Sequence, residues 1–302
     1  MLRLGFALVV AAMATLSSGC SIRKLAINSL ADAFESAGAV YASDSDPELI
    51  EAALPFSLKT IEALVVEAPR NRNLLLSACS GFTQYSYAFV LARAEDLELD
   101  DYTESERQKD RALALSLRGR DYCLRALELD HPGITERLRT EPVAAAAEPD
   151  AEAIDLLYWT GASWGSAMSV GVHRLDVVAD LPAVQALVER VLAIDSRYED
   201  GAVHEVMISV ESLPEAMGGS PERAREHFAK AVELSAGTSA SPYVSLAAGI
   251  VVAEQNRAEF VELLEKALAV DVDQEPTRRL ANVVAQRRAE LLLERIDEFF
   301  IE

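Results

Sequence analysis

A recurring spacing of small and apolar residues near the ends of four segments limits most strongly what this chain can fold into. In the segment 221–235, Ala224, Phe228 and Ala231 fall on one side of a helix because their spacing follows the helical period. Small or apolar residues at the same spacing precede positions 130, 195 and 271. One copy could arise in any amphipathic helix, but four copies in one chain indicate a degenerate helical repeat.

The distance between successive copies indicates the kind of repeat. The last three copies end at residues 195, 235 and 271, so they are 40 and 36 residues apart. These intervals are close to the period of about 34 residues that is typical of tetratricopeptide repeats, whereas the first interval, 65 residues from position 130, implies an insertion. Half of the residues are apolar, and glycine and proline are few, which favours helices. We therefore expect an all-α protein with degenerate tetratricopeptide-like helical repeats in an α-α superhelix.

Residues 1–19 have the pattern of a lipoprotein signal peptide. Arg3 precedes an apolar run from Leu4 to Leu16 that is too short to span a membrane, and small residues lead up to Cys20. We expect cleavage before Cys20 and a lipid on its thiol; the alternative is an ordinary cleaved signal peptide with an incidental cysteine. Serine rather than aspartate at Ser21 favours sorting to an outer membrane.

The mature chain is expected to be strongly acidic. Loss of Arg3 with the signal peptide leaves 27 of the 28 basic residues against 49 acidic ones, a net charge of −22. Nucleic-acid binding needs clustered lysine and arginine, so this balance argues against it. No later apolar run approaches the length of a transmembrane helix, so lipid is the expected attachment to the membrane.

Two cysteines, Cys79 and Cys123, remain in the mature chain. An oxidising compartment would permit a disulfide between them. Both stand in apolar helical patterns, where cysteine commonly serves as a small core residue, and this favours unpaired thiols. The sequence does not decide whether they pair.

Helix signals divide the mature chain into two regions. Residues 20–140 form an N-terminal helical region, residues 141–150 are a possible linker with two prolines around an alanine run, and residues 151–302 form the repeat region. The linker could equally hold a short ordered turn. Asp46 before Pro47 and Ser220 before Pro221 are expected helix starts. The expected helices cover residues 22–37, 47–68, 72–97, 103–129, 153–170, 181–195, 201–217, 221–235, 243–255, 258–270 and 277–299.

The sequence has no recognised catalytic signature. His204-Glu205 begins like a zinc-protease motif, but Ile208 stands where the second histidine is required. Asp271 and Asp273 resemble the start of a calcium loop, which then lacks its glycine. Glycine-rich phosphate loops and nucleophile elbows do not occur in the sequence. We therefore expect no catalytic residue, no metal and no cofactor, and an enzyme would require an unrecognised arrangement.

Aromatic and polar residues on helix faces are candidates for binding a ligand or partner. The alternative is packing for the aromatic residues and a solvated helix flank for the polar pair. Inner helices of a repeat array line its concave surface, and this favours a groove. The candidates are Phe82, Tyr85, Trp159, Trp164, His204, Glu205 and Tyr243.

Several separated blocks of sequence carry a resemblance to a known family. They are GFTQYSYAFV at 81–90, GRDYCLRALELDHPG at 119–133, DLPAVQALVERVLAID at 180–195, GAVHE at 201–205, REHFAKAVELSAGTSASPYVSLA, and the terminal RRLANVVAQRRAELLL. Together with the cysteine motif around Cys20, they resemble the T-component lipoproteins (TatT) of TRAP transporters. The chain departs from that family at Cys123, where glycine is expected, and in its strongly acidic balance.

The resemblance implies an all-helical periplasmic lipoprotein with cryptic tetratricopeptide-like repeats, assembled as a homotrimer with a central pore. Its implied partner is the solute-binding protein, or P component, of a TRAP transporter, to which it would pass a hydrophobic or carboxylate-bearing small molecule. A generic outer-membrane scaffold for envelope assembly is the alternative, because it needs only repeats and a lipid anchor.

Overall fold

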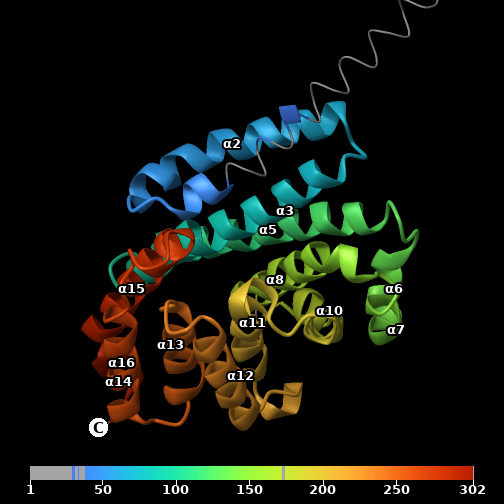
Figure 1. Ribbon diagram of the computed structural model, residues 1–302. Coiled ribbons are helices and arrows are strands. Elements are labelled where there is room, and N and C mark those ends of the chain that lie inside the picture. Colours follow the sequence, from blue (N-terminus) through green and yellow to red (C-terminus); the bar gives the residue numbers. More distant parts are fainter. Residues whose placement is uncertain (1–28, 31–32, 34–37, 172–173, 302) are drawn as a thin grey trace, which may run out of the picture.

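The computed structural model describes residues 29–30, 33, 38–171 and 174–301, and every regular element within them is helical (Figure 1). The all-α prediction is therefore confirmed. The N-terminal half contains α2 (Pro47–Glu67), α3 (Arg72–Tyr85), the π-helical turn η1 (Ser86–Leu91), α4 (Ala92–Leu97), α5 (Tyr102–Leu127), α6 (Ile134–Thr140), α7 (Pro142–Ala146), η2 (Ala151–Ala153) and α8 (Ile154–Val170).

The C-terminal half consists of shorter antiparallel helices that curve away from α8 (Figure 1). They are α9 (Leu175–Val178), α10 (Leu181–Ile194), η3 (Tyr198–Gly201), α11 (Ala202–Glu211), η4 (Glu215–Met217), α12 (Pro221–Leu234), α13 (Ser241–Leu246), η5 (Ala247–Val251), α14 (Arg257–Leu268), η6 (Pro276–Arg278), α15 (Arg279–Glu294) and α16 (Ile296–Phe299).

The helix starts follow the predicted capping residues. The Asp46 side chain accepts a hydrogen bond from Leu49 N, and Pro47 occupies the first turn of α2. Ser220 caps α12 in the same way by accepting from Arg223 N. The first predicted helix, residues 22–37, and Cys20 with the signal peptide lie almost wholly outside the described residues.

Two predicted helices are interrupted where the sequence suggested continuity. The segment expected over residues 72–97 contains the π-helical turn η1, and the segment 243–255 contains η5 and ends in turns.

A third predicted helix, over residues 201–217, ends earlier than expected. It stops at Glu211, because Pro214 and Gly219 force a tight reversal. A side chain at Gly219 would lie 1.8 Å from the Leu213 carbonyl oxygen, so glycine is required there.

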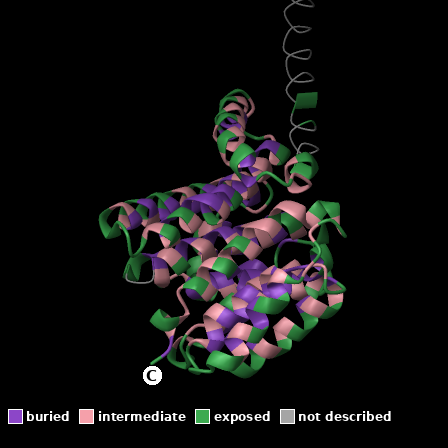
Figure 2. Cartoon of the chain, turned by 90° about the vertical axis from the view of Figure 1, so that its left-hand side faces the viewer, coloured by how far each residue is buried: buried purple, intermediate pink, exposed green. Residues whose placement is uncertain are grey.

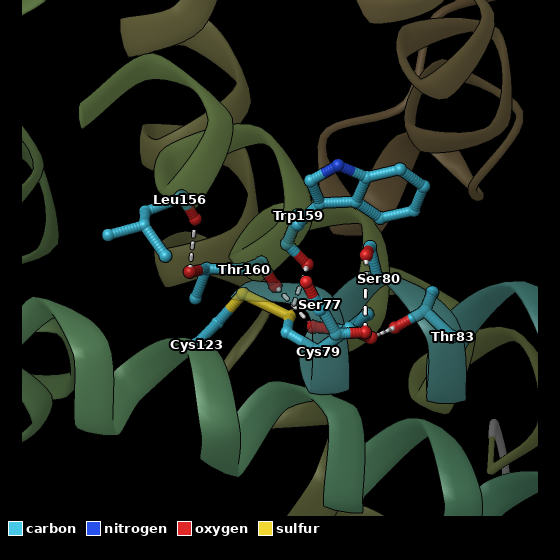
Figure 3. The surroundings of a disulfide bond; sticks show 9 residues. Ser77, Cys79, Ser80, Thr83, Cys123, Leu156, Trp159 and Thr160 are labelled. Carbon is cyan, nitrogen blue, oxygen red and sulfur yellow. Dashed lines mark hydrogen bonds between the residues drawn. A yellow bond between two sulfur atoms is a disulfide. The ribbon is translucent and has the colours of Figure 1, made fainter. Parts of the chain in front are cut away.

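A disulfide joins the two long helices α3 and α5 at their closest approach (Figure 3). Cys79 and Cys123 pair with their Cα atoms 5.4 Å apart, so the expectation of unpaired thiols is wrong, although both residues are fully buried as expected. The helices come this close because Gly119 lacks a side chain: a Cβ there would lie 2.9 Å from the Cys79 carbonyl oxygen. The Trp159 carbonyl oxygen lies 3.7 Å from Cys79 Sγ, so α8 packs over the same point.

The proposed linker is partly helical. Residues 142–146 form α7, and Ala145 and Ala146 are buried in the same hydrophobic cluster as α10. Arg190 on α10 donates to the Pro149 carbonyl oxygen at 2.9 Å. This is the short ordered turn that the sequence left open as the alternative to a flexible linker.

Two hydrophobic clusters meet along α11. Figure 2 shows that buried residues run through the interior of both parts of the helical array. Val203, Met207 and Val210 belong to the first cluster, which fills the space among α2–α10, whereas Ile208 belongs to the second, which fills the space among α12–α16. Helix α11 is therefore the apolar connection between the two halves.

A polar connection joins the two halves at the opposite side, through α15. Arg279 donates to Ser43 O at 2.8 Å, and Arg287 pairs with Glu48 at 2.7 Å. Arg288 pairs with Glu95 at 2.8 Å and donates to the Tyr87 hydroxyl, and Arg295 donates to the carbonyl oxygens of residues 95 and 96. We call these four arginines the arginine clasp; it closes the curved array onto α2 and α4 (Figure 1).

Removing the disulfide is expected to lower the free energy of unfolding by about 2–4 kcal/mol, because it closes a loop of 44 residues in the unfolded chain. The double variant Cys79→Ala/Cys123→Ala should show a lower denaturant midpoint than the parent under oxidising conditions. The two proteins should become nearly equal once the parent is reduced. An unchanged midpoint in oxidising buffer would contradict this account.

The clasp should contribute more to stability than a surface ion pair of the same helical region. Arg288→Met leaves the recessed Glu95 carboxyl without its partner, and we expect a loss of about 1–3 kcal/mol in the free energy of unfolding. The control is Arg257→Met, which breaks the exposed pair with Asp297 and should cost less than about 1 kcal/mol. Equal losses in the two variants, measured by chemical denaturation, would refute a special role for the clasp.

Candidate functional site

Polar and aromatic side chains gather where α8, η3, α11, the loop after α12, η6 and the start of α15 meet. We call this group the junction cluster; its members are Tyr158, Trp159, Glu199, Glu205, Ser239, Arg278 and Asn282. Tyr158 lies within electrostatic reach of Glu205, Glu199 and Arg278, so these groups share one environment. Charged side chains and aromatic rings of one cluster can contact a small molecule from several sides.

Glu205 is the acidic centre of the junction cluster. It projects from the first turn of α11 and accepts a hydrogen bond from the Ser239 hydroxyl at 2.9 Å. Burial raises the pKa of this carboxyl, and Ser239, Arg278 and Ser241 offset only part of that shift. Glu205 as a whole residue is of intermediate exposure, so the protein does not enclose it completely.

Asn282 fixes the loop that carries Ser239. Its side-chain amide donates to Thr238 O at 2.8 Å, and its carbonyl oxygen accepts from Ala240 N at 2.9 Å. Ala236 and Gly237 in this loop have left-handed backbone conformations, with φ of 51° and 74°. Asn282 is itself buried, so its hydrogen bonds hold a strained turn in a position that the site requires.

A second strained turn lies on the other side of Arg278. Glu199 and Asp200 have φ of 47° and 50°, and Gly201 follows at 100°. The Arg278 guanidinium donates to Glu199 O at 3.1 Å and lies 3.6 Å from the Asp200 carboxylate. Left-handed non-glycine residues are costly and gather at functional sites, and Arg278 contacts two of them, Glu199 and Asp200, in this turn.

An aromatic group forms the apolar side of the cluster. The rings of Tyr158 and Trp159 lie 5.2 Å apart edge to face, and Tyr158 lies 4.9 Å from Tyr198. Tyr198 donates to Asp155 at 2.6 Å. Burial raises the pKa of Tyr158, so its hydroxyl stays protonated and can donate or accept a hydrogen bond.

The structure gives the predicted site residues different surroundings. Trp159 and Glu205 are both members of the junction cluster, Trp159 through its ring contact with Tyr158 and Glu205 through its electrostatic effect on Tyr158. Phe82, Tyr85 and Trp164 are core residues with 3%, 6% and 0% of their surface exposed, and they are not accessible to a ligand. Arginines lie over all three rings, with Arg118 over Phe82 at 4.8 Å.

His204 faces away from Glu205 and forms a pair that the sequence did not indicate. Its Nδ1 lies 2.8 Å from Nδ1 of His227 on α12, and His204 is 7% exposed. Burial is the main cause of the lowered pKa values of both rings, so both favour the neutral form. Only the distance between α11 and α12 reveals this pair, because residues 23 positions apart share no sequence pattern.

Tyr243 lies beside a different feature, a pocket of about 480 Å³ between α12, α13 and α14. Its ring packs edge to face against Phe228, 5.4 Å away, and Phe228 lines the pocket. Arg225 in this pocket is paired with Glu254 at 2.6 Å and Glu259 at 2.5 Å, and Lys266 with Glu262 at 2.6 Å, so these cations are held more closely than Arg278, which lies 3.6 Å from Asp200. We therefore place the candidate site at the junction cluster, where groups are strained and desolvated, rather than at this pocket.

Sequence reasoning missed Ser239, Arg278 and Asn282 as members of the site. The polar Asn282 within the apolar stripe of the last helix was the available signal, since a buried amide there needs partners. Within residues 38–171 and 174–301, no three His, Cys, Asp or Glu side chains are placed to hold a metal ion. None of the helices in the described part of the chain has the length and apolar character needed to cross a membrane.

Comparison with known proteins identifies the family. Residues 43–300 match the TRAP transporter T-component family, and this span includes every element from α2 to α16. The chain belongs to the TRAP transporter T-component family. It is also similar to an uncharacterized protein of Treponema pallidum (strain Nichols), with 28% identity over 309 positions and 95% of each chain covered.

Membership in the T-component family confirms the resemblance found in the sequence blocks and makes the protein a transport-associated accessory. The structure also accounts for the departure at Cys123, where a glycine was expected: the cysteine forms the disulfide with Cys79. The disulfide also depends on Gly119, one turn before Cys123, because a side chain there would keep α3 and α5 farther apart.

Replacing Glu205 should change how stability depends on pH. Its raised pKa means that the folded protein holds the proton more tightly than the unfolded chain, so the parent loses stability as pH rises above the ordinary glutamate value of 4.5. Glu205→Gln keeps the acceptor for Ser239 and lacks this loss, so its denaturation midpoint relative to the parent should increase as the pH rises above 4.5 and then level off once the folded carboxyl has ionised.

The matched control is Glu233→Gln on α12. The exposed Glu233 carboxyl has a lowered pKa because of its hydrogen bond with Lys230, so its replacement should give a small change of opposite sign. A difference between Glu205→Gln and the parent that stays constant as the pH rises would contradict the desolvated carboxyl.

Proposed function

We propose that this T component is a non-enzymatic periplasmic lipoprotein that binds the P-component solute-binding protein of a TRAP transporter. In this proposal it passes a hydrophobic or carboxylate-bearing small molecule to that partner. Family membership over residues 43–300 supports the transport role. The buried disulfide supports an oxidising compartment such as the periplasm, since disulfides are rare in the cytosol.

The junction cluster is the observation that carries the ligand-binding part of the proposal. Tyr158 and Trp159 offer an apolar surface, and Arg278 offers a guanidinium that can pair with a carboxylate. Burial raises the pKa of Glu205, and in its protonated form this carboxyl can donate a hydrogen bond to the same carboxylate. These groups suit a small organic acid with an apolar portion.

We further propose that the helices form degenerate tetratricopeptide-like repeats in a superhelix. Helices α10 and α11, α12 and α13, and α14 and α15 are successive antiparallel pairs, whose first members begin at residues 181, 221 and 257. Contacts of α11 with α13 and of α13 with α15 place the second members in one row. The candidate site lies at the start of this row, where α8 meets α11.

The remaining parts of the proposal concern anchoring and assembly. Cys20 would carry the lipid, Ser21 favours the outer membrane, and the family resemblance implies a homotrimer with a central pore. A generic outer-membrane scaffold remains the second candidate, and genes for transporter components or for envelope assembly beside this gene separate the two.

Co-purification tests the proposed function directly. The full-length lipoprotein, isolated in detergent from cells that produce the neighbouring TRAP solute-binding protein, should retain that protein and a small organic acid detectable by native mass spectrometry. Trp159→Ala should reduce the retained acid several-fold without loss of the partner, because it removes one wall of the cluster. Tyr102→Ala, an exposed aromatic on α5 outside the cluster, is the control and should retain both. Failure to recover any solute-binding protein would contradict the proposal.

A further inference from the structure

The outer face of α2 carries an exposed apolar stripe. Leu49, Phe56 and Val66 are 56%, 79% and 78% exposed. The intervening positions of the stripe are also exposed, and one of them is the single basic residue of the helix. The positions of the stripe are alternately three and four residues apart along the helix. They are Leu49, Ala52, Phe56, Lys59, Ala63 and Val66.

This spacing is typical of the seam of paired helices rather than of a solvated face. A repeat of 3.5 residues keeps one line of side chains facing a second helix over several turns. The opposite side of α2, with Ile50, Leu58 and Ile61, is buried against the rest of the protein. The helix is therefore apolar on two sides, and one of them lacks a cover among the described residues.

The stripe is complementary to itself when a second copy runs antiparallel. Numbering from the two ends, Leu49 then faces Val66 of the second copy, Ala52 faces Ala63, and Phe56 faces Lys59. Large residues meet at both ends, and the small pairs permit close approach of the helices. At the centre, the Lys59 ammonium lies against the Phe56 ring, which is a favourable cation–π arrangement.

Lys59 is free to change partner at little cost. It now pairs with Glu62 at 2.5 Å from an exposed position. Glu62 would keep two other partners, because it accepts from the Tyr122 hydroxyl at 2.7 Å and pairs with Arg118. Moving Lys59 onto a second copy therefore leaves no buried charge unpaired.

Charge argues against two other arrangements. A parallel pair would place Lys59 against Lys59 and Phe56 against Phe56, so the cations would repel each other. An anionic membrane surface is disfavoured because α2 carries Glu48, Glu51, Glu62 and Glu67 against one lysine, within a chain of net charge −21.

We propose that two copies of this protein pair antiparallel through the exposed stripe of α2. The contact is two-fold, whereas the contacts within a homotrimer are head-to-tail, so this pairing is a separate association that can join two single chains or two trimers. One helix seam is near the lower limit of about 1,000 Å² for a stable interface, so the pair is weak in dilute solution. Attachment to one membrane would raise the effective concentration of the copies.

Cysteine cross-linking tests the pairing and its direction. Three full-length proteins are compared in detergent: Ala52→Cys, Ala63→Cys and the double variant that carries both changes. Each is oxidised, and the fraction of covalent dimer is measured on non-reducing gels. Antiparallel pairing predicts strong cross-linking of the double variant and background levels for each single variant. The native Cys79–Cys123 disulfide is buried and does not interfere.

Each other outcome overturns the proposal. Cross-linking of the single variants would show a parallel contact, and no cross-linking of any variant would show that another occupant covers the stripe, such as the chain's own residues 22–37. As an independent measurement, the particle mass of the parent in sedimentation should rise toward twofold with increasing protein concentration, and Phe56→Glu should abolish that rise. Val143→Glu, at an equally exposed apolar position on α7, should leave the rise unchanged.

Discussion

The ion pair between Arg288 and Glu95 fixes how the two halves of this protein face each other. Burial is the leading cause of the raised pKa of Glu95 even though a guanidinium lies 2.8 Å away, so the pair stands in a recess rather than on the open surface. Elsewhere the halves are joined through the apolar packing of α11. One apolar edge alone would leave the array free to bend, and the arginine clasp closes the opposite edge.

The junction cluster depends on α15, the helix that carries the arginine clasp. Arg278, directly before α15, contacts one strained turn, and Asn282 in its first turn holds the other. Farther along, Arg287, Arg288 and Arg295 hold the later part of α15 against α2 and α4. Strained loops persist only where surrounding contacts over-determine them. The clasp therefore supports the geometry of Glu205 and Ser239 from a distance, through the position of α15.

The sequence predicted the local structure well, because local structure follows from spacing and caps. The starts of α2 and α12 were evident from Asp46-Pro47 and Ser220-Pro221, and the apolar spacing located the major helices within a few residues. Of the residues predicted for the site, Trp159 and Glu205 stay candidates as members of the junction cluster, whereas Phe82 and Trp164 are buried. Aromatic residues at helical spacing look alike in sequence whether they face a core or a groove.

Tertiary contacts explain what the sequence did not reveal. The Cys79–Cys123 pair depends on the approach of α3 and α5 at Gly119, and the His204–His227 pair depends on how α11 lies against α12. Arg278 is one of many arginines in the chain, and only the fold brings it against the left-handed turn at Glu199 and Asp200. The Glu48–Arg287 pair connects α2, the helix proposed to bind a second copy, to α15, which carries part of the junction cluster. A second copy bound to α2 would therefore hold the element on which the candidate ligand site is built.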